Sequence, residues 1–108
     1  MQINWSEHAI DDLREIVSYV GTSFGRRKAE DVFAEIRHTA ELLKDFPMLG
    51  KSFVEDKELG IAYRTVPSKL NQMVYYIDGD AIIIVAVWQN RRDIRRLKSF
   101  LKQKPLLS

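Results

Sequence analysis

Arginine and lysine side chains gather near the predicted strands in the C-terminal half of the chain. Arg64 lies inside a strand-like segment, and Lys69 lies in the connection that follows it. Arg91 and Arg92 come directly after the apolar run 81–88. Guanidinium and ammonium groups bind phosphate and stabilise negative charge that develops in a transition state. If the fold brings these residues together, they form an anion-binding groove.

Arg64 is the most informative of these residues, because an unpaired charge on the inner part of a sheet is costly. We expect it to contact a carboxylate, a phosphate or an open groove. The alternative is a partly exposed arginine that pairs with an acidic side chain. Tyr75 and Tyr76 point to opposite faces of one strand, so only one of them shares a surface with Arg64, and the period does not decide which. If the groove is that of a nuclease, the catalytic candidates are Arg64, Lys69, Arg91 and Tyr75 or Tyr76.

Positive charge is concentrated at the C-terminal end of a chain whose net charge is only +2. From residue 89 onward there are seven basic side chains and one acidic one, Asp93. Such an excess attracts an anionic partner, although most charge runs are solvated helix faces that aid solubility. The candidates for target binding are Arg91, Arg92, Arg95, Arg96 and Lys98.

The composition argues against several classes of protein. The chain has no cysteine, and its two histidines, His8 and His38, are too far apart to indicate zinc, so we expect no metal and no cofactor. No phosphate-binding glycine loop, Ser/His/Asp set or nucleotide fingerprint is present. The longest apolar run, residues 81–88, is far too short for a membrane span, and no signal sequence is visible. These features predict a soluble protein of the reducing cytoplasm.

Two helical patterns occupy the N-terminal half of the chain. A short strand-like start is followed by Ser6, a helix cap, and by apolar residues at helical spacing up to Val20. The segment 21–25 interrupts this pattern, and a second helical pattern runs from Ala29 to Phe46. A short loop between two such helices predicts an antiparallel helical hairpin.

Strand patterns follow. Residues 61–66 alternate with a period of two, and residues 72–77 and 81–88 flank an Asp-Gly-Asp turn, with the later strand expected to be central. We expect residues 55–58 to form a loop, a basic amphipathic helix to follow Asp93, and residues 103–108 to be a loose end. The 108 residues fit one domain. The predicted class is α+β, with the helical hairpin packed on a small, mainly antiparallel sheet in the order β-α-α-β-β-β-α.

An ordered set of residues extends over most of this pattern. The first helix carries Trp5-Ser6, Ala9, Asp12-Leu13, Ile16 and Tyr19, and the second ends with Leu43, Phe46-Pro47 and Gly50. Further along come Tyr63-Arg64, Pro67, Tyr75 or Tyr76, Gly79-Asp80, Ile82 and Arg92-Asp93. In these residues the chain resembles the ParE/RelE superfamily of toxins from type II toxin–antitoxin, or plasmid stabilisation, modules, and especially its ParE branch.

The resemblance implies a toxin that a cognate antitoxin, often acidic, holds inactive by wrapping the sheet and the helical hairpin in a hetero-oligomer. ParE-like members inhibit DNA gyrase without cutting nucleic acid, whereas RelE-like members cut messenger RNA in the ribosome. RelE-like members often use a tyrosine or histidine near the C-terminus, and residues 89–108 contain neither. We therefore expect a gyrase inhibitor. A ribosome-dependent endoribonuclease is the alternative, and an inactive module that retains only antitoxin binding is a third hypothesis.

Overall fold

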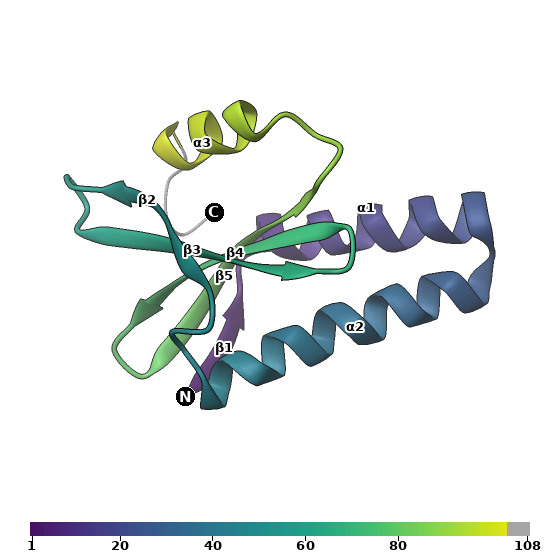
Figure 1. The fold of residues 1–108 in the computed structure, drawn as a ribbon, viewed down its shortest axis with the longest axis horizontal. Coiled ribbons are helices and arrows are strands. Elements are labelled where there is room, and N and C mark those ends of the chain that lie inside the picture. The colour runs from purple at the N-terminus through teal and green to yellow at the C-terminus, as the bar shows by residue number, and fades with distance from the viewer. Residues whose placement is uncertain (104–108) are drawn as a thin grey trace.

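Ser6 caps the first of two long helices in the computed structural model, which describes residues 1–103 (Figure 1). Its Oγ accepts a hydrogen bond from the Ala9 N–H at 3.0 Å and donates one to the Val85 carbonyl oxygen at 3.2 Å. The same hydroxyl therefore satisfies a free amide at the start of the helix and ties that helix to the sheet.

Replacing Ser6 with alanine should lower the free energy of unfolding by about 1–2 kcal/mol, since both hydrogen bonds are lost. Chemical denaturation at constant pH measures this change. Ser18→Ala is the matched control, because Ser18 is exposed in the middle of the same helix, where alanine is the better helix former. If both variants lost the same free energy of unfolding, the hydrogen bonds of Ser6 would make no specific contribution to stability.

The two helices form the predicted antiparallel hairpin. They are α1 (Glu7–Phe24) and α2 (Arg26–Asp45), and the single residue Gly25 connects them with a φ of 96°, a backbone conformation that favours glycine. The predicted interruption over residues 21–25 is wrong for residues 21–24, which continue α1. Gly21 faces Ala29 of α2, where an added Cβ would lie 3.6 Å from the alanine Cβ. Small residues at this end of the hairpin allow the helices to approach closely.

Five strands form one sheet in the order β1-β5-β4-β3-β2. β1 pairs with β5 in parallel, and the other pairs are antiparallel, so the sheet is mainly antiparallel as expected. The apolar run 81–88 lies within β5, which is an interior strand and mostly buried. The strands are β1 (Gln2–Trp5), β2 (Lys51–Asp56), β3 (Ile61–Ser68), β4 (Asn71–Asp78) and β5 (Ala81–Gln89).

The element order contains one strand more than the sequence predicted. β2 is an edge strand paired with β3, and it includes Glu55 and Asp56 of the expected loop. The register shifts between Ser52 and Val54, so the neighbours Phe53 and Val54 are both half-buried. A bulge of this kind breaks the alternation of apolar and polar residues by which a strand is recognised in a sequence.

The sheet is covered on both faces, which gives three layers (Figure 1). The helical hairpin packs on one face through Ile36, Leu43 and their neighbours, against residues such as Tyr75 of the sheet. The closing helix α3 (Ile94–Gln103) covers the other face with Leu97 and Leu101. The predicted α+β class is confirmed. The expected loose end begins at Gln103, which belongs to α3, and residues 104–108 lie outside the described part of the chain.

Candidate functional site

Arg64 and Tyr75 lie opposite each other on β3 and β4 and hold the same segment, residues 46–50, which we call the 46–50 loop. The Tyr75 hydroxyl donates a hydrogen bond to the Pro47 carbonyl oxygen at 2.7 Å and accepts one from the Gly50 N–H at 2.9 Å. Arg64 Nε donates to the Gly50 carbonyl oxygen at 2.8 Å, and its Nη2 donates to another carbonyl oxygen of the loop at 3.4 Å. Two side chains of the sheet thus clamp the loop that joins α2 to β2.

These contacts answer two questions that the sequence left open. Arg64 was expected at a carboxylate, a phosphate or an open groove, with an acidic side chain as the alternative partner, and its hydrogen-bond partners are backbone carbonyl oxygens of the loop. Tyr75 is the tyrosine that shares a face with Arg64, whereas Tyr76 lies on the other face against Tyr63, with ring centroids 5.8 Å apart. Burial, aided by the nearby Asp78 carboxylate, raises the pKa of Tyr76. Tyr75 is fully buried and its hydroxyl already donates and accepts within the fold, so a substrate would have to displace the loop to reach it.

Lys69 and Arg91 lie at a different place, beside a groove between the helical hairpin and the turn that joins β3 to β4. We call this cavity of about 790 Å³ the hairpin groove. Its lining is mostly apolar and includes Tyr19, Phe24 and Leu70, all of which are exposed to solvent. A hollow with this lining has the composition of a binding site for an apolar segment.

The turn beside the groove has a strained backbone. Lys69 has a φ of 55°, which side-chain-bearing residues rarely adopt, and Leu70 follows it with 79% of its surface exposed. The Leu70 carbonyl oxygen accepts a hydrogen bond from the Asn90 N–H at 2.8 Å, which ties the turn to the end of β5. The turn therefore presents a large apolar side chain at a fixed position.

The arginines that follow β5 stack on aromatic rings. The Arg91 guanidinium lies 4.5 Å from the centroid of the Tyr19 ring, and its Nε donates a hydrogen bond to Gln89 Oε1 at 2.7 Å. The Arg92 guanidinium lies 3.8 Å from the Trp88 ring. A shallow hollow beside α1 brings both of them together with Arg14. Three arginines and one carboxylate, Glu15, line this hollow, and cation–π contacts hold Arg91 and Arg92 in place.

The remaining target-binding candidates are on or next to α3. Arg95 pairs with Asp93, its Nη2 lying 2.9 Å from Oδ2, and these hydrogen bonds hold the pKa of Asp93 below its usual value. Lys98 Nζ lies 5.6 Å from the Phe53 ring centroid, and Arg96 is exposed. The basic face of α3 is therefore turned to solvent while Leu97 and Leu101 are buried.

The candidates for catalysis divide into two groups. Lys69 lies in the turn after β3, and the strand from Arg64 to Ser68 alone corresponds to about 13 Å of extended chain. The hairpin groove contains Lys69 and Arg91 but neither Arg64 nor Tyr75. The four candidates therefore do not line one common groove.

The groove also contains residues that were not among the catalytic candidates. His38 and Glu35 line it, so an imidazole and a carboxylate lie beside the same groove as Lys69 and Arg91. Both belong to α2, and their helical spacing relative to Asp31, seven and four residues earlier, is the signal that could have placed them on this face.

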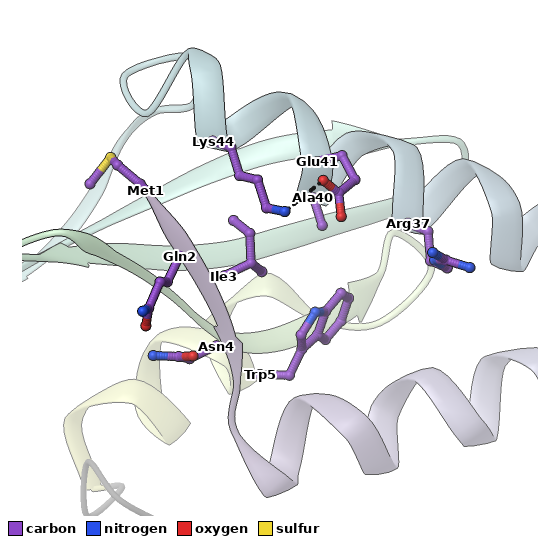
Figure 2. A pocket seen from close by; sticks show the side chains of 9 residues that line it. All are labelled: Met1, Gln2, Ile3, Asn4, Trp5, Arg37, Ala40, Glu41 and Lys44. Carbon is purple, nitrogen blue, oxygen red and sulfur yellow. Dashed lines mark ion pairs between the residues drawn. The ribbon is translucent and has the colours of Figure 1, made fainter.

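A second hollow, of about 430 Å³, lies beside the free edge of β1 (Figure 2). Ile3 and Trp5 of β1 face residues of α2 across it, and the Lys44 ammonium pairs with the Glu41 carboxylate at 3.0 Å. The cations near this hollow are therefore partly neutralised.

Neither a cluster of metal-binding side chains nor a membrane-spanning helix is found within residues 1–103. In that range no three histidine or acidic side chains are arranged to hold an ion. None of the helices there combines the length and the apolar character that crossing a membrane requires.

Two solved structures have a similar fold. A chain of a chromosomal ParDE toxin–antitoxin system from P. aeruginosa superposes with a TM-score of 0.68 at 20% identity, covering 82% of this chain and 95% of that one. A YoeB/ParE toxin from Agrobacterium tumefaciens superposes with a TM-score of 0.51 at 15% identity, covering 82% and 98%. At these identities the likeness concerns the fold.

The sequence comparisons identify the family. No curated protein matches the chain. The family model for the ParE toxin of the type II toxin–antitoxin system parDE matches residues 3–94, which is most of the chain and confirms the resemblance. This family implies a cognate antitoxin, ParD, as partner. The chain belongs to the ParE toxin family of type II toxin–antitoxin systems.

Proposed function

We propose that this protein is a non-enzymatic toxin that acts in the cytoplasm by inhibiting DNA gyrase and that a cognate antitoxin neutralises it. The observation that carries the proposal is the separation of the catalytic candidates. Arg64 and Tyr75 are committed to the 46–50 loop, whereas Lys69 and Arg91 lie beside the hairpin groove. A fold that keeps these groups apart favours binding over phosphoryl transfer, which requires them at one phosphate.

The hairpin groove is the surface that we assign to the antitoxin. Its exposed apolar side chains suit the apolar face of a helical or extended segment. Lys28, Lys69 and Arg91 line the same groove, together with the acidic residues Asp31 and Glu35. The three cations favour a segment that carries acidic residues beside its apolar face.

The cations after β5 are the surface that we assign to the target. Arg91, Arg92, Arg95, Arg96 and Lys98 supply positive charge that is mostly exposed to solvent. Gyrase operates on DNA, so a complex of gyrase with DNA presents phosphates to such a patch. Because Arg91 also lines the hairpin groove, an antitoxin bound there would cover part of the target surface.

Induction of this protein alone in a bacterial host tests the proposal. We expect growth to stop, gyrase supercoiling to fail and messenger RNA to stay intact. The double variant R91A/R92A should restore growth, whereas R26A/R27A, an adjacent pair of exposed arginines on α2, should remain toxic. Growth arrest with normal supercoiling would contradict gyrase inhibition, and a harmless wild-type chain would support the inactive antitoxin-binding module.

The hairpin groove also supports a second function, the ribosome-dependent endoribonuclease. His38 and Glu35 line the groove beside Lys69 and Arg91, which gives a proton-transfer group and cations at one place. In this case messages would be cut after induction. His38→Ala would lower the rate of message cutting by about 100-fold or more, which is the usual contribution of general acid–base catalysis. DNA supercoiling by gyrase would be unaffected.

A further inference from the structure

The 46–50 loop exposes three large apolar side chains within four residues. Phe46, Met48 and Leu49 have 59%, 63% and 50% of their surface exposed. Single apolar residues on a surface are ordinary, but a contiguous set of this size marks an interaction site.

The loop is rigidly held. The Leu49 N–H donates a hydrogen bond to the Phe46 carbonyl oxygen at 3.0 Å, and the clamp formed by Arg64 and Tyr75 fixes the rest. A Cβ added at Gly50 would lie 2.7 Å from a carbonyl oxygen of β3, so the loop backbone contacts the sheet closely. A surface ordered before binding loses little conformational entropy when a partner arrives.

The charges beside the loop indicate what the partner carries. Arg64 is half-buried under the loop, and its hydrogen bonds there go to neutral carbonyl oxygens. Lys51 follows the loop directly, and none of the ion pairs formed within residues 1–103 includes either side chain. Asp45, which directly precedes the loop and is exposed, is the acidic residue beside the patch, and Lys51 and Arg64 outnumber it. This net positive charge next to an apolar patch fits a protein surface where carboxylates surround an apolar pocket.

The loop is separate from the surfaces assigned above. α2 has 20 residues and so extends about 30 Å. The α2 residues that line the hairpin groove end at His38, and the 46–50 loop begins eight residues later, about 12 Å further along, after the C-terminal end of the helix (Figure 1). None of the loop residues lines the groove, so an antitoxin segment that occupies only the groove would leave the loop uncovered.

We propose that the 46–50 loop is a protein-docking element that inserts Phe46, Met48 and Leu49 into an apolar pocket on an acidic surface of the toxin's protein target. This inference rests on the proposed toxin function. It adds an apolar contact at one end of the molecule to the cationic contact at the end of β5.

Matched pairs of variants in the induction assay test this inference. Leu49→Asp places a charge in the apolar contact, and Leu59→Asp makes the same change in the turn between β2 and β3, at a leucine that is 52% exposed. Lys51→Glu and Lys57→Glu form the corresponding pair for charge. Loss of a central apolar anchor weakens binding by about 30-fold or more. We expect Leu49→Asp and Lys51→Glu to restore growth, whereas both controls remain toxic and all four melt like the wild type.

The other outcomes overturn the inference in distinguishable ways. If Leu49→Asp remains toxic, or if Leu59→Asp loses toxicity to the same extent, the loop has no special role in docking. The toxin function would still stand in either case. A wild-type chain that leaves growth unchanged overturns both statements. If Leu49→Asp no longer copurifies with the cognate antitoxin, the loop binds the antitoxin. If it dissociates a dimer seen by light scattering, the loop binds a second copy. Should Leu49→Asp not fold, Phe46→Ser carries the same test.

Discussion

Replacing Gly50 with alanine should lower the free energy of unfolding by about 3 kcal/mol and the Tm by about 10 °C. The new Cβ would lie 2.7 Å from the Thr65 carbonyl oxygen and 2.8 Å from both Cε1 and Oη of Tyr75. These atoms belong to the backbone of β3 and to a fully buried ring. Neither can move aside to make room for the new Cβ, as the end of a flexible side chain could. Relief of the overlap would also stretch the hydrogen bonds that Gly50 makes with Tyr75 and Arg64.

Thermal and chemical denaturation measure this effect, and Gly21→Ala is the matched control. At Gly21 the added Cβ would lie 3.6 Å from the Ala29 Cβ, which is ordinary van der Waals contact within a helix. Alanine there should be neutral or stabilise the protein by up to about 1 kcal/mol. A Gly50→Ala variant as stable as the Gly21→Ala variant would contradict the close packing of the loop on the sheet.

Asp12→Asn should change the free energy of unfolding more favourably at neutral pH than at pH 4, by about 2 kcal/mol. Burial raises the pKa of Asp12 from its ordinary value of 3.8 to about 6, and the hydrogen bond from the Val87 N–H opposes this shift only in part. The folded protein therefore holds the proton more tightly than the unfolded chain. Stability from this group is fully present below pH 3.8 and is lost as the pH rises through about 6.

Asparagine removes the charge and keeps the contacts. Its carbonyl oxygen can accept the Val87 N–H, which now donates to Asp12 Oδ2 at 2.9 Å, and its amide can donate to His8 Nε2, now 3.3 Å from Oδ1. Unfolding free energies measured in urea between pH 4 and 8 test the prediction. The difference between variant and wild type should grow with pH for Asp12→Asn and stay constant for Asp11→Asn, an exposed neighbour. If the free energy of unfolding of Asp12→Asn followed the same pH profile as that of the wild type, the prediction would be wrong.

The elements that the sequence predicted well are those with an undisturbed period. The helical stripes of α1 and α2 and the continuous apolar run of β5 were all recognised, since each buries a regular set of positions. β2 was missed because its bulge at Ser52–Val54 breaks the period of two. The length of α1 was underestimated because the segment 21–25 was interpreted as an interruption, whereas residues 21–24 are helical and only Gly25 leaves the helix.

The candidate site was predicted less completely, because it depends on contacts between segments far apart in the chain. Arg64 was recognised as a charge that needs a partner, but its partners are carbonyl oxygens of a loop 14 to 16 residues earlier. The face occupied by Tyr75 follows from the same loop contacts. No local pattern encodes that Lys69 and Arg91 meet at the hairpin groove, since the pairing of β4 with β5 creates this proximity.

The parallel pairing of β1 with β5 has a consequence for the timing of biosynthesis. Gln2 pairs with Ala81, so the first strand to leave the ribosome waits for the last one. At about 5–20 residues per second, translation of the roughly 80 residues between them takes about 4–16 s. The helical hairpin, built from local contacts, can form during that interval, but the sheet cannot close. If toxicity requires the complete sheet, each newly made copy therefore becomes toxic only seconds after its first strand has been synthesised.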